Sequence, residues 1–441
     1  MSGLLLPVGA LSIVFAVGAY HATHRTPTYR FGTQNGLGWY VLYAALHIGA
    51  AYVAGLPDEP KDVQHAFVGA IGAAGVSASL FALFQVVRPG TLPRFVVAAA
   101  PFPIAAWTVL CSVTAIRSHS TGRLRDRVLA VISAEDGATL RLDAEAEFPL
   151  PDRPFSLVSI VELSEVLATR RPRSTLSAIA SSTSPTVIVL SEEAQGAENL
   201  VDEVVRLHAA GIRVRSLTAF YDEWLGKLPL SELGKMAMLF DINDLHGHRY
   251  RQMKRAIDIA GGLVGSIGLV LVSPFVAIGN VFGNRGPLIF RQKRVGRDGT
   301  IFTVFKFRTM RQDALDELMP WTHPDDPRIT PFGRVLRRAH IDELPQMINV
   351  LKGNLSLVGP RPEQPQFVAE LETKLAFYSL RHLVQPGLTG WAQVKYHYAA
   401  TEAHAFEKLQ YDLYYLRHQS LFFDWRIMGR TVRSVLWAKG H

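Results

Sequence analysis

The chain has 441 residues, of which 48% are hydrophobic and only 19% are charged, and its mean hydropathy is +0.14. This apolar content is too high for a soluble chain of this length, so part of it is expected to lie in a membrane. The single cysteine, Cys111, excludes a disulfide framework and a cysteine-based zinc site. The net charge is +8, and residues 251–441 hold 26 basic and 16 acidic side chains. The basic excess of the C-terminal part indicates a partner with phosphates, such as a nucleotide, a lipid headgroup, a membrane surface or a nucleic acid.

Residues 1–120 are predicted to form a four-helix transmembrane region. Four stretches contain no Lys, Arg, Asp or Glu and approach the ~20 residues that a helix needs to cross a bilayer. They are residues 4–20, 39–56, 65–87 and 95–116. Arginines after the fourth stretch favour a cytoplasmic exit, but the arginines of the first and third loops would then lie outside. The orientation therefore stays open.

Residues 121–245 are predicted to form a Rossmann-like α/β domain. Residues 128–132, 186–190 and 212–217 have the pattern of strands, and residues 198–210 that of an amphipathic helix. A dinucleotide site would need glycines after the first strand, where this chain instead has Glu135 and Asp136. We therefore expect a structural or regulatory domain without cofactor. Its Ser-, Thr-, Pro- and Arg-rich residues 170–185 are expected to form a surface loop.

Residues 256–282 are predicted to form a re-entrant membrane helix. Ser273 and Pro274 lie about two thirds of the way along this apolar run, and basic residues flank both of its ends. Proline removes a backbone donor and clashes with the preceding turn, so a helix broken here could return to the face that it entered. Both basic flanks would then lie on one side of the membrane. A kinked helix that spans the membrane gives nearly the same pattern.

The C-terminal part holds three short candidate segments. Lys306 and Arg308 alternate with Phe305 and Phe307, which predicts a strand with one cationic face, either phosphate-binding or simply solvated.

Asp342 begins a run in which Leu344, Met347, Ile348 and Leu351 have helical spacing, and Pro345 is tolerable only in a first turn. Asp342 and Glu343 would thus lie at the positive end of the helix dipole beside Arg337 and Arg338. This place keeps a carboxylate ionised and attracts phosphates, although ordinary helix capping explains the pattern as well. In the third segment, Pro360 and Pro362 stiffen the loop around Arg361, which suits a guanidinium that grips a phosphate.

These segments occur in a fixed order together with Phe-Arg-Gln-Lys-Arg-Val-Gly, Asp-Glu-Leu-Pro-Gln, Gly-Pro-Arg-Pro, Pro-Gly-Leu-Thr-Gly-Trp and Tyr-Asp-Leu-Tyr-Tyr. Over about residues 251–441 the set resembles the bacterial sugar transferases known as monotopic phosphoglycosyl transferases, which places their catalytic domain at residues 246–441. The whole architecture is similar to their large members, the undecaprenyl-phosphate sugar-1-phosphate transferases of exopolysaccharide synthesis. One departure is Arg338-Ala-His-Ile before Asp342, where the family more often has a Ser or Thr.

The resemblance implies an α/β catalytic domain that carries the re-entrant helix, and a two-step reaction. Asp342 would attack the β-phosphorus of a UDP-sugar and release UMP, and a polyprenyl phosphate would then take the sugar phosphate from the aspartyl intermediate. Glu343 would hold Mg²⁺ beside it. The residues implied to bind substrate are Lys306, Arg308, Arg338, Arg361, Arg381 and Asp412, and Ser273 and Pro274 would be structural.

The implied setting is the bacterial inner membrane, with several spans, membrane lipid as a contact and the catalytic domain in the cytoplasm. No nucleic-acid partner is expected, and a homodimer is left open. Two other functions remain. A membrane-anchored nucleotide-sugar oxidoreductase or epimerase would need a glycine-rich turn after residues 128–132. A non-catalytic scaffold would not need Asp342, Glu343 and Arg361 together.

Overall fold

The computed structural model describes residues 2–24, 34–56, 63–88, 91–120, 126–147, 155–168, 172–232, 247–284, 286–311, 326, 328–396 and 402–437. It divides into two compact units. The first comprises Met1–Arg123 and Gly429–Lys439, and the second comprises Leu124–Met428 and Gly440–His441.

The first unit is built from apolar helices, as the sequence predicts. They are α1 (Ser2–His24), α2 (Gln34–Val53), α3 (Val63–Val87), α4 (Arg94–Ala99) and α5 (Pro101–Ser120). The fourth predicted stretch is thus divided in two, because Pro101 brings no backbone donor to a continuous helix. Segments Leu5–His24, Ala66–Val86 and Arg94–Thr114 are long and apolar enough to cross a membrane, and the apolar part of α2, Leu37–Val53, is shorter.

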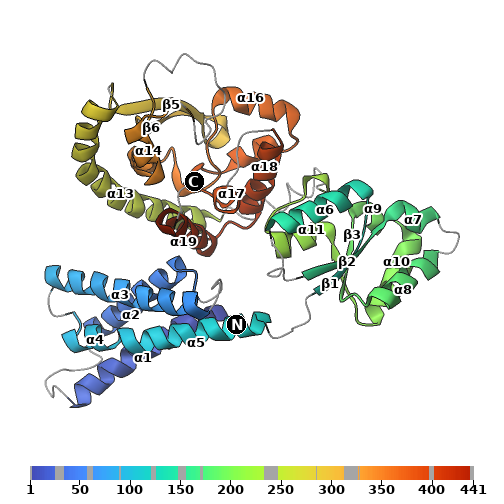
Figure 1. The fold of residues 1–441 in the computed structure, drawn as a ribbon, viewed down its shortest axis with the longest axis horizontal. Helices are drawn as coiled ribbons and strands as arrows, with labels where there is room; N and C mark the ends of the chain where they lie inside the picture. The colour runs from blue at the N-terminus through green and yellow to red at the C-terminus, as the bar shows by residue number, and fades with distance from the viewer. Residues whose placement is uncertain are drawn as a thin grey trace. The chain divides into compact units, whose positions relative to one another are not determined.

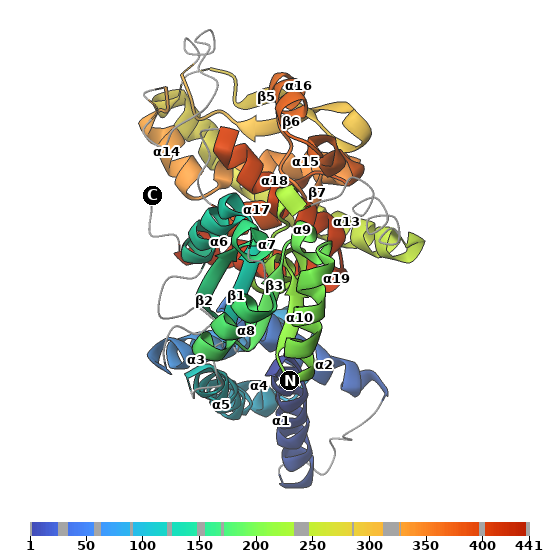
Figure 2. The ribbon, with the colours of Figure 1, turned by 90° about the vertical axis from the view of Figure 1, so that its right-hand side faces the viewer.

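The second unit begins with a parallel sheet of four strands in the order β2-β1-β3-β4. Figure 2 shows β2, β1 and β3 side by side. Alternate side chains of β1 enter two separate cores, one against α6 and α11 and the other against α8 and α10 (Figure 1). The elements are β1 (Asp126–Ile132), α6 (Ala134–Glu147), β2 (Phe155–Glu162), α7 (Leu163–Ala168), α8 (Pro172–Thr183), β3 (Val187–Leu190), α9 (Glu192–Gln195), α10 (Glu198–Ala209), β4 (Arg213–Ser216) and α11 (Leu217–Phe220).

The loop predicted over residues 170–185 is wrong for most of its length, because α8 occupies Pro172–Thr183. Leu176 and Ala180, one turn apart, are buried in the core beside β1 and β3. Burial of this narrow apolar stripe stabilises a helix whose Ser and Thr content alone favours a loop.

The rest of the second unit is a mixed α/β domain. Its elements are α13 (His248–Gly283), β5 (Ile289–Val295), β6 (Ile301–Phe307), α14 (Pro331–Arg338), the 3-10 helix η5 (Ile341–Gln346), α15 (Met347–Lys352), β7 (Ser356–Val358), α16 (Pro365–Lys374), η6 (Tyr378–Leu383), β8 (Gly387–Thr389), α17 (Trp391–Lys395), α18 (Glu402–Arg417) and the start of α19 (Leu421–Trp437). The part of α19 from Gly429 onward belongs to the first unit. Strands β5 and β6 form an antiparallel hairpin, and β7 pairs in parallel with β8.

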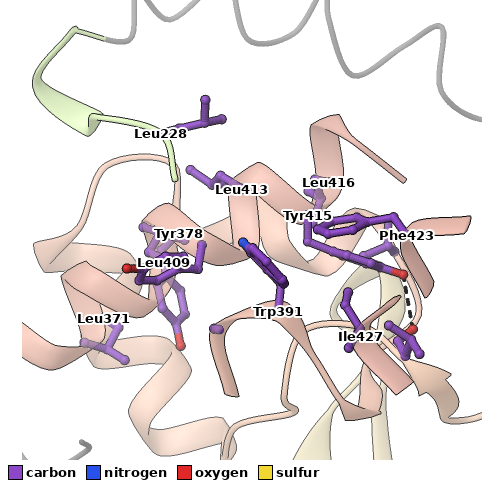
Figure 3. Packing of buried hydrophobic residues seen from close by; sticks show 14 of the residues in the cluster. Leu228, Leu371, Tyr378, Trp391, Leu409, Leu413, Tyr415, Leu416, Phe423 and Ile427 are labelled. Carbon is purple, nitrogen blue, oxygen red and sulfur yellow. Dashed lines mark hydrogen bonds between the residues drawn. The ribbon is translucent and has the colours of Figure 1, made fainter. Parts of the chain in front are cut away.

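The core of this domain lies between α17, α18 and the start of α19 (Figure 3). Trp391 packs against Phe423, with ring centroids 5.0 Å apart, and Tyr415 donates to the Asp424 carboxylate at 2.8 Å. Leu228, which precedes the predicted start of this domain, is 1% exposed in the same core. Leu228 and Leu230, which the prediction placed in the middle domain, therefore pack in the C-terminal domain.

Lys227 joins the parallel-sheet domain to α18. Its side chain is almost fully buried and its ammonium forms ion pairs with Asp143 of α6, at 2.7 Å, and with Glu407 of α18. Beside it, the Trp391 indole N–H donates to the Gly226 carbonyl oxygen at 2.8 Å. Because buried charges are stable only when paired, this network fixes the position of α18 relative to α6.

Helix α13 does not end at Pro274, since helical backbone continues to Gly283. The helix is curved in Figure 1. Pro274 lies inside it, and Ser273 Oγ donates to the Leu269 carbonyl oxygen at 2.6 Å, which is compatible with a proline bend. Ten large apolar side chains of α13, from Ile259 to Phe282, are exposed, and Phe282 reaches 83%. Such a surface is typical of contact with lipid.

Candidate active site

The acidic pair Asp342 and Glu343 lies at the start of a helical segment, as predicted. Helix η5 begins at Ile341 and leads into α15 at Met347, so the first turns are 3-10 rather than α-helical. Pro345 lies inside η5, two residues before α15 begins, so its missing N–H costs α15 no hydrogen bond. The preceding His340 has φ 52°, a left-handed conformation that a non-glycine residue adopts at an energetic cost. Residues held in this way are often functional.

Glu343 lies between two cations from distant parts of the chain. Lys306 Nζ on β6 donates to Glu343 Oε1 at 2.7 Å, and Arg361 Nη2 donates to the same oxygen at 2.9 Å. Burial disfavours the charged carboxylate, but Arg361 and Lys306 outweigh it and hold the pKa of Glu343 well below its ordinary value. Glu343 is therefore a fixed negative charge, and no donor to its Oε2 is found among the described residues.

Asp342 is 9% exposed and forms no hydrogen bond with the part of the chain that the structure describes. Burial and the negative charge of Glu343 raise the pKa of Asp342, while Lys306, Arg337 and His340 oppose the shift. The expectation of an ionised carboxylate considered only the helix end and the arginines, and burial acts in the opposite direction. A carboxylate that forms no hydrogen bond within the described residues has none to break before it reacts.

Arg337 rather than Arg338 is the arginine whose charge acts on Asp342. Both end α14, but Arg338 is exposed, whereas Arg337 Nε donates to Thr309 Oγ1 at 2.9 Å. Gly333, one turn earlier, lies so close to Thr309 that a Cβ there would meet the Thr309 carbonyl oxygen at 2.0 Å. The face of α14 that holds Gly333 and Arg337 is therefore the one turned toward the site.

Arg361 is held still, as the two flanking prolines predict. Gly359 N–H donates to the Thr389 carbonyl oxygen, and Gly387 N–H donates to the Pro360 carbonyl oxygen, both at 2.9 Å. A Cβ on Gly359 would lie 2.3 Å from the Gln385 carbonyl oxygen, so only glycine permits this contact. Strand β8 thus braces the two residues that directly precede Arg361.

Arg381 and Asp412 form a buried ion pair at 2.7 Å. Arg381 also donates to the Tyr378 hydroxyl, at 2.6 Å, and to the Arg361 carbonyl oxygen, at 3.0 Å. The pair lines a pocket next to Arg361. Two predicted substrate-binding residues thus come together here, where their visible contacts position the Arg361 loop.

Arg308 lies just past the end of β6, and its Nε donates to the Pro287 carbonyl oxygen at 2.9 Å. The contacts described for it are with the turn before β5, and its part as a phosphate clamp stays a prediction.

Asn349, which sequence reasoning did not find, holds α15 against β6 beside the acidic pair. This fully buried amide accepts from Phe305 N–H at 3.2 Å and donates to the Thr303 carbonyl oxygen at 2.7 Å. It therefore aligns α15, and with it η5, against the strand that carries Lys306. Nothing in the sequence separates Asn349 from a solvent-exposed helical asparagine.

A magnesium ion fits part of this donor set. Mg²⁺ commonly takes one or two carboxylates and completes its shell with water and substrate phosphates. Glu343 Oε2 and the Asp342 carboxylate are oxygens without a donor in the described ranges. A cluster of three or more His, Cys, Asp or Glu ligands is absent from those ranges. The site thus suits an ion shared with a substrate rather than one held by the protein alone.

Comparison with known proteins gives one family match and three relatives. Residues 249–438 match the family described as bacterial sugar transferase. The UDP-N-acetylgalactosamine-undecaprenyl-phosphate N-acetylgalactosaminephosphotransferase of Aeromonas hydrophila is 40% identical over 190 residues, which are 42% of this chain and 44% of the relative. The UDP-glucose:undecaprenyl-phosphate glucose-1-phosphate transferase of Escherichia coli (strain K12) is 41% identical over 187 residues, which are 41% of this chain and 40% of the relative.

The chain therefore spans about two fifths of the length of these two relatives. The exopolysaccharide production protein PSS of Rhizobium leguminosarum bv. phaseoli is shorter. It is 39% identical over 190 residues, which are 42% of this chain and 95% of the relative.

Proposed function

Because the chain belongs to the bacterial sugar transferase family, we propose that it transfers a sugar 1-phosphate from a UDP-sugar to undecaprenyl phosphate and releases UMP. The Aeromonas and Escherichia relatives are named for such transfers, of N-acetylgalactosamine phosphate and of glucose 1-phosphate. The observation that carries the proposal is the buried Asp342 carboxylate, which forms no ion pair among the described residues. It lies beside Glu343, whose carboxylate pairs with Lys306 and Arg361.

The proposed reaction has two displacements at one phosphorus. An Asp342 oxygen attacks the β-phosphorus of the UDP-sugar, and the bond from this phosphorus to the bridging oxygen breaks. UMP leaves with the electron pair, and the sugar phosphate remains on Asp342 as an acyl phosphate. An oxygen of the lipid phosphate then attacks the same phosphorus, and the Asp342 bond breaks. Lys306, Arg337 and Arg361 supply the positive charge that such a transfer requires.

We further propose that Glu343 holds Mg²⁺ against the substrate diphosphate, with Asp342 beside it. The bound ion would neutralise phosphate charge. Lys306 and Arg361 share Glu343 Oε1, which leaves Oε2 for coordination. The same two cations keep the carboxylate deprotonated, as a metal ligand must be.

The membrane arrangement is also a proposal: α13 enters and leaves on one face of the inner membrane, with the catalytic domain in the cytoplasm. Its first half packs on α15, where Arg255 donates to the Val350 and Leu351 carbonyl oxygens, each at 2.6 Å. Its last turns pack on α14, where Gly279 and Gly283 face Phe332. Two ends that contact one domain favour a re-entrant helix over a spanning one.

Cysteine labelling tests this arrangement. In a Cys111→Ser background, an impermeant maleimide should label the exposed position Ser231→Cys and His441→Cys from the same side of sealed vesicles. Pro274→Leu should restore a backbone hydrogen bond and let part of the molecules span, so that residue 441 becomes labelled from both sides. Labelling of residues 231 and 441 from opposite faces in the chain with Pro274 intact would contradict the re-entrant helix.

The parallel order of β2-β1-β3-β4 supports the Rossmann-like interpretation of the middle domain. The turn after β1 is capped within the chain, since Ser133 Oγ accepts from Asp136 N–H at 3.1 Å. An acidic side chain there repels a pyrophosphate, so the contacts favour neither an oxidoreductase nor an epimerase.

Release of UMP from the purified chain tests the reaction itself. With undecaprenyl phosphate and a panel of UDP-sugars, we expect UMP release that depends on the lipid for multiple turnovers and is confined to one or a few sugars. Release of UDP would indicate transfer of the sugar without its phosphate, and no release across the panel would contradict the proposed function.

A further inference from the structure

The pocket beside Arg361 contains the cationic side chain of Lys408, which takes no part in the reaction steps above. Its walls include Arg361, Arg381, Gln393, Tyr396, Lys408 and Asp412. Arg361 belongs to both places, because the same guanidinium that binds Glu343 also lines this pocket. A molecule in the pocket would therefore lie next to the acidic pair.

Most charges in the pocket wall are already paired. Arg381 forms its ion pair with Asp412 at 2.7 Å, and Glu363 lies 3.5 Å from Arg294. Lys408 has neither an ion pair nor a hydrogen bond within the described ranges, although it lies on α18 one turn before Asp412. Burial lowers the pKa of Lys408, and Glu363 opposes that shift. A half-buried ammonium that forms no ion pair is stabilised when an anion enters beside it.

Gln393 adds a second unsatisfied group. Its Oε1 is buried without a hydrogen-bond donor, and its Nε2 has only a long contact, 3.5 Å, to the Leu388 carbonyl oxygen. A buried acceptor without a donor is rare and costs free energy. A ligand with N–H or O–H groups would satisfy it, which a nucleoside has and a polyprenyl chain lacks.

The contacts place the charged groups in order along the site. Asp342 adjoins Glu343, Arg361 pairs with Glu343 at 2.9 Å, and Arg361 and Lys408 line the same pocket. Arg361 therefore lies between the acidic pair and Lys408. A diphosphate whose β-phosphorus meets Asp342 and which passes Arg361 would thus place its other phosphate near Lys408.

We propose that Lys408 binds the phosphate of the leaving nucleotide and that Gln393 hydrogen-bonds its nucleoside. This inference rests on the proposed function and assigns the pocket to the UMP half of the UDP-sugar. A lipid phosphate is the other anion that reaches this site, so the experiment separates the two sources.

Binding to the full chain in nanodiscs is the first test. By calorimetry, Lys408→Met should weaken UMP binding about 10- to 100-fold, the range for loss of one charge-assisted hydrogen bond. Uridine, which has no phosphate, should bind both proteins with affinities within about 3-fold. Lys408→Arg should recover most of the UMP affinity, and Gln393→Leu should weaken UMP and uridine alike.

Lys374→Met is the matched control, because Lys374 is an exposed lysine on α16 that pairs with Glu370 at 2.8 Å. It should bind UMP as the parent chain does. Equal UMP affinity in Lys408→Met and the parent chain, with unchanged thermal unfolding, would overturn the proposal. So would a Lys408→Met enzyme that needs more undecaprenyl phosphate but releases UMP normally, since Lys408 would then serve the lipid. A parent chain that releases no UMP would instead refute the proposed function itself.

Discussion

Asp342→Asn should abolish both UMP release and the covalent sugar-phosphate adduct, with a fall in turnover of about 10⁴-fold or more. The amide keeps the size of the side chain but has no anionic oxygen to attack phosphorus. Because Asp342 forms no hydrogen bond with the described part of the chain, the change breaks no contact seen there. The variant should therefore insert in membranes and unfold at the same temperature as the parent chain.

The measurement is UMP release together with mass spectrometry of the chain after incubation with UDP-sugar and no lipid. Asp298→Asn is a matched control, because Asp298 is exposed in the turn between β5 and β6 and has φ 54°. Asparagine tolerates that left-handed conformation, so this variant should keep full activity. Near-normal turnover of the Asp342→Asn chain would show that Asp342 is not the nucleophile.

The parts of the site that depend on neighbours in sequence could be predicted. The acidic pair at a helix start and the stiff loop around Arg361 follow from proline positions and helical spacing over fewer than ten residues. The contact of Lys306 with Glu343 could not be predicted as a pair, because 37 residues separate them. Only the packing of β6 on η5 and the buried Asn349 bring them together.

The choice between Arg337 and Arg338 shows the same limit. The two side chains point about 100° apart around α14, and the sequence does not say which face of a short helix meets the site. Gly333 was the available signal, since a glycine inside a helix can mark a close approach of backbone. Lys408 could not be predicted for another reason. The proposed role depends on its lack of an ion pair, because the nearby carboxylates pair with other cations, and only the fold shows those pairs.

Glu343→Gln should lower turnover by about 10²- to 10⁴-fold, which is the next largest effect expected. The substituted amide keeps an oxygen that can accept from Lys306 and Arg361 but loses the charge that both cations balance. A neutral amide is also a poorer ligand for Mg²⁺. Two partly buried cations without an anion would then repel each other, so a lower unfolding temperature is expected as well.

Metal dependence distinguishes the two roles of Glu343. EDTA should stop the parent chain, and added Mg²⁺ should restore it, whereas excess Mg²⁺ should not restore Glu343→Gln. Glu370→Gln, on the exposed surface of α16, should behave as the parent chain in both conditions. If the parent chain keeps full activity in EDTA, Glu343 acts only by holding Lys306 and Arg361. Lys306→Met and Arg361→Met should then cost as much as Glu343→Gln, because the three residues would work as one unit.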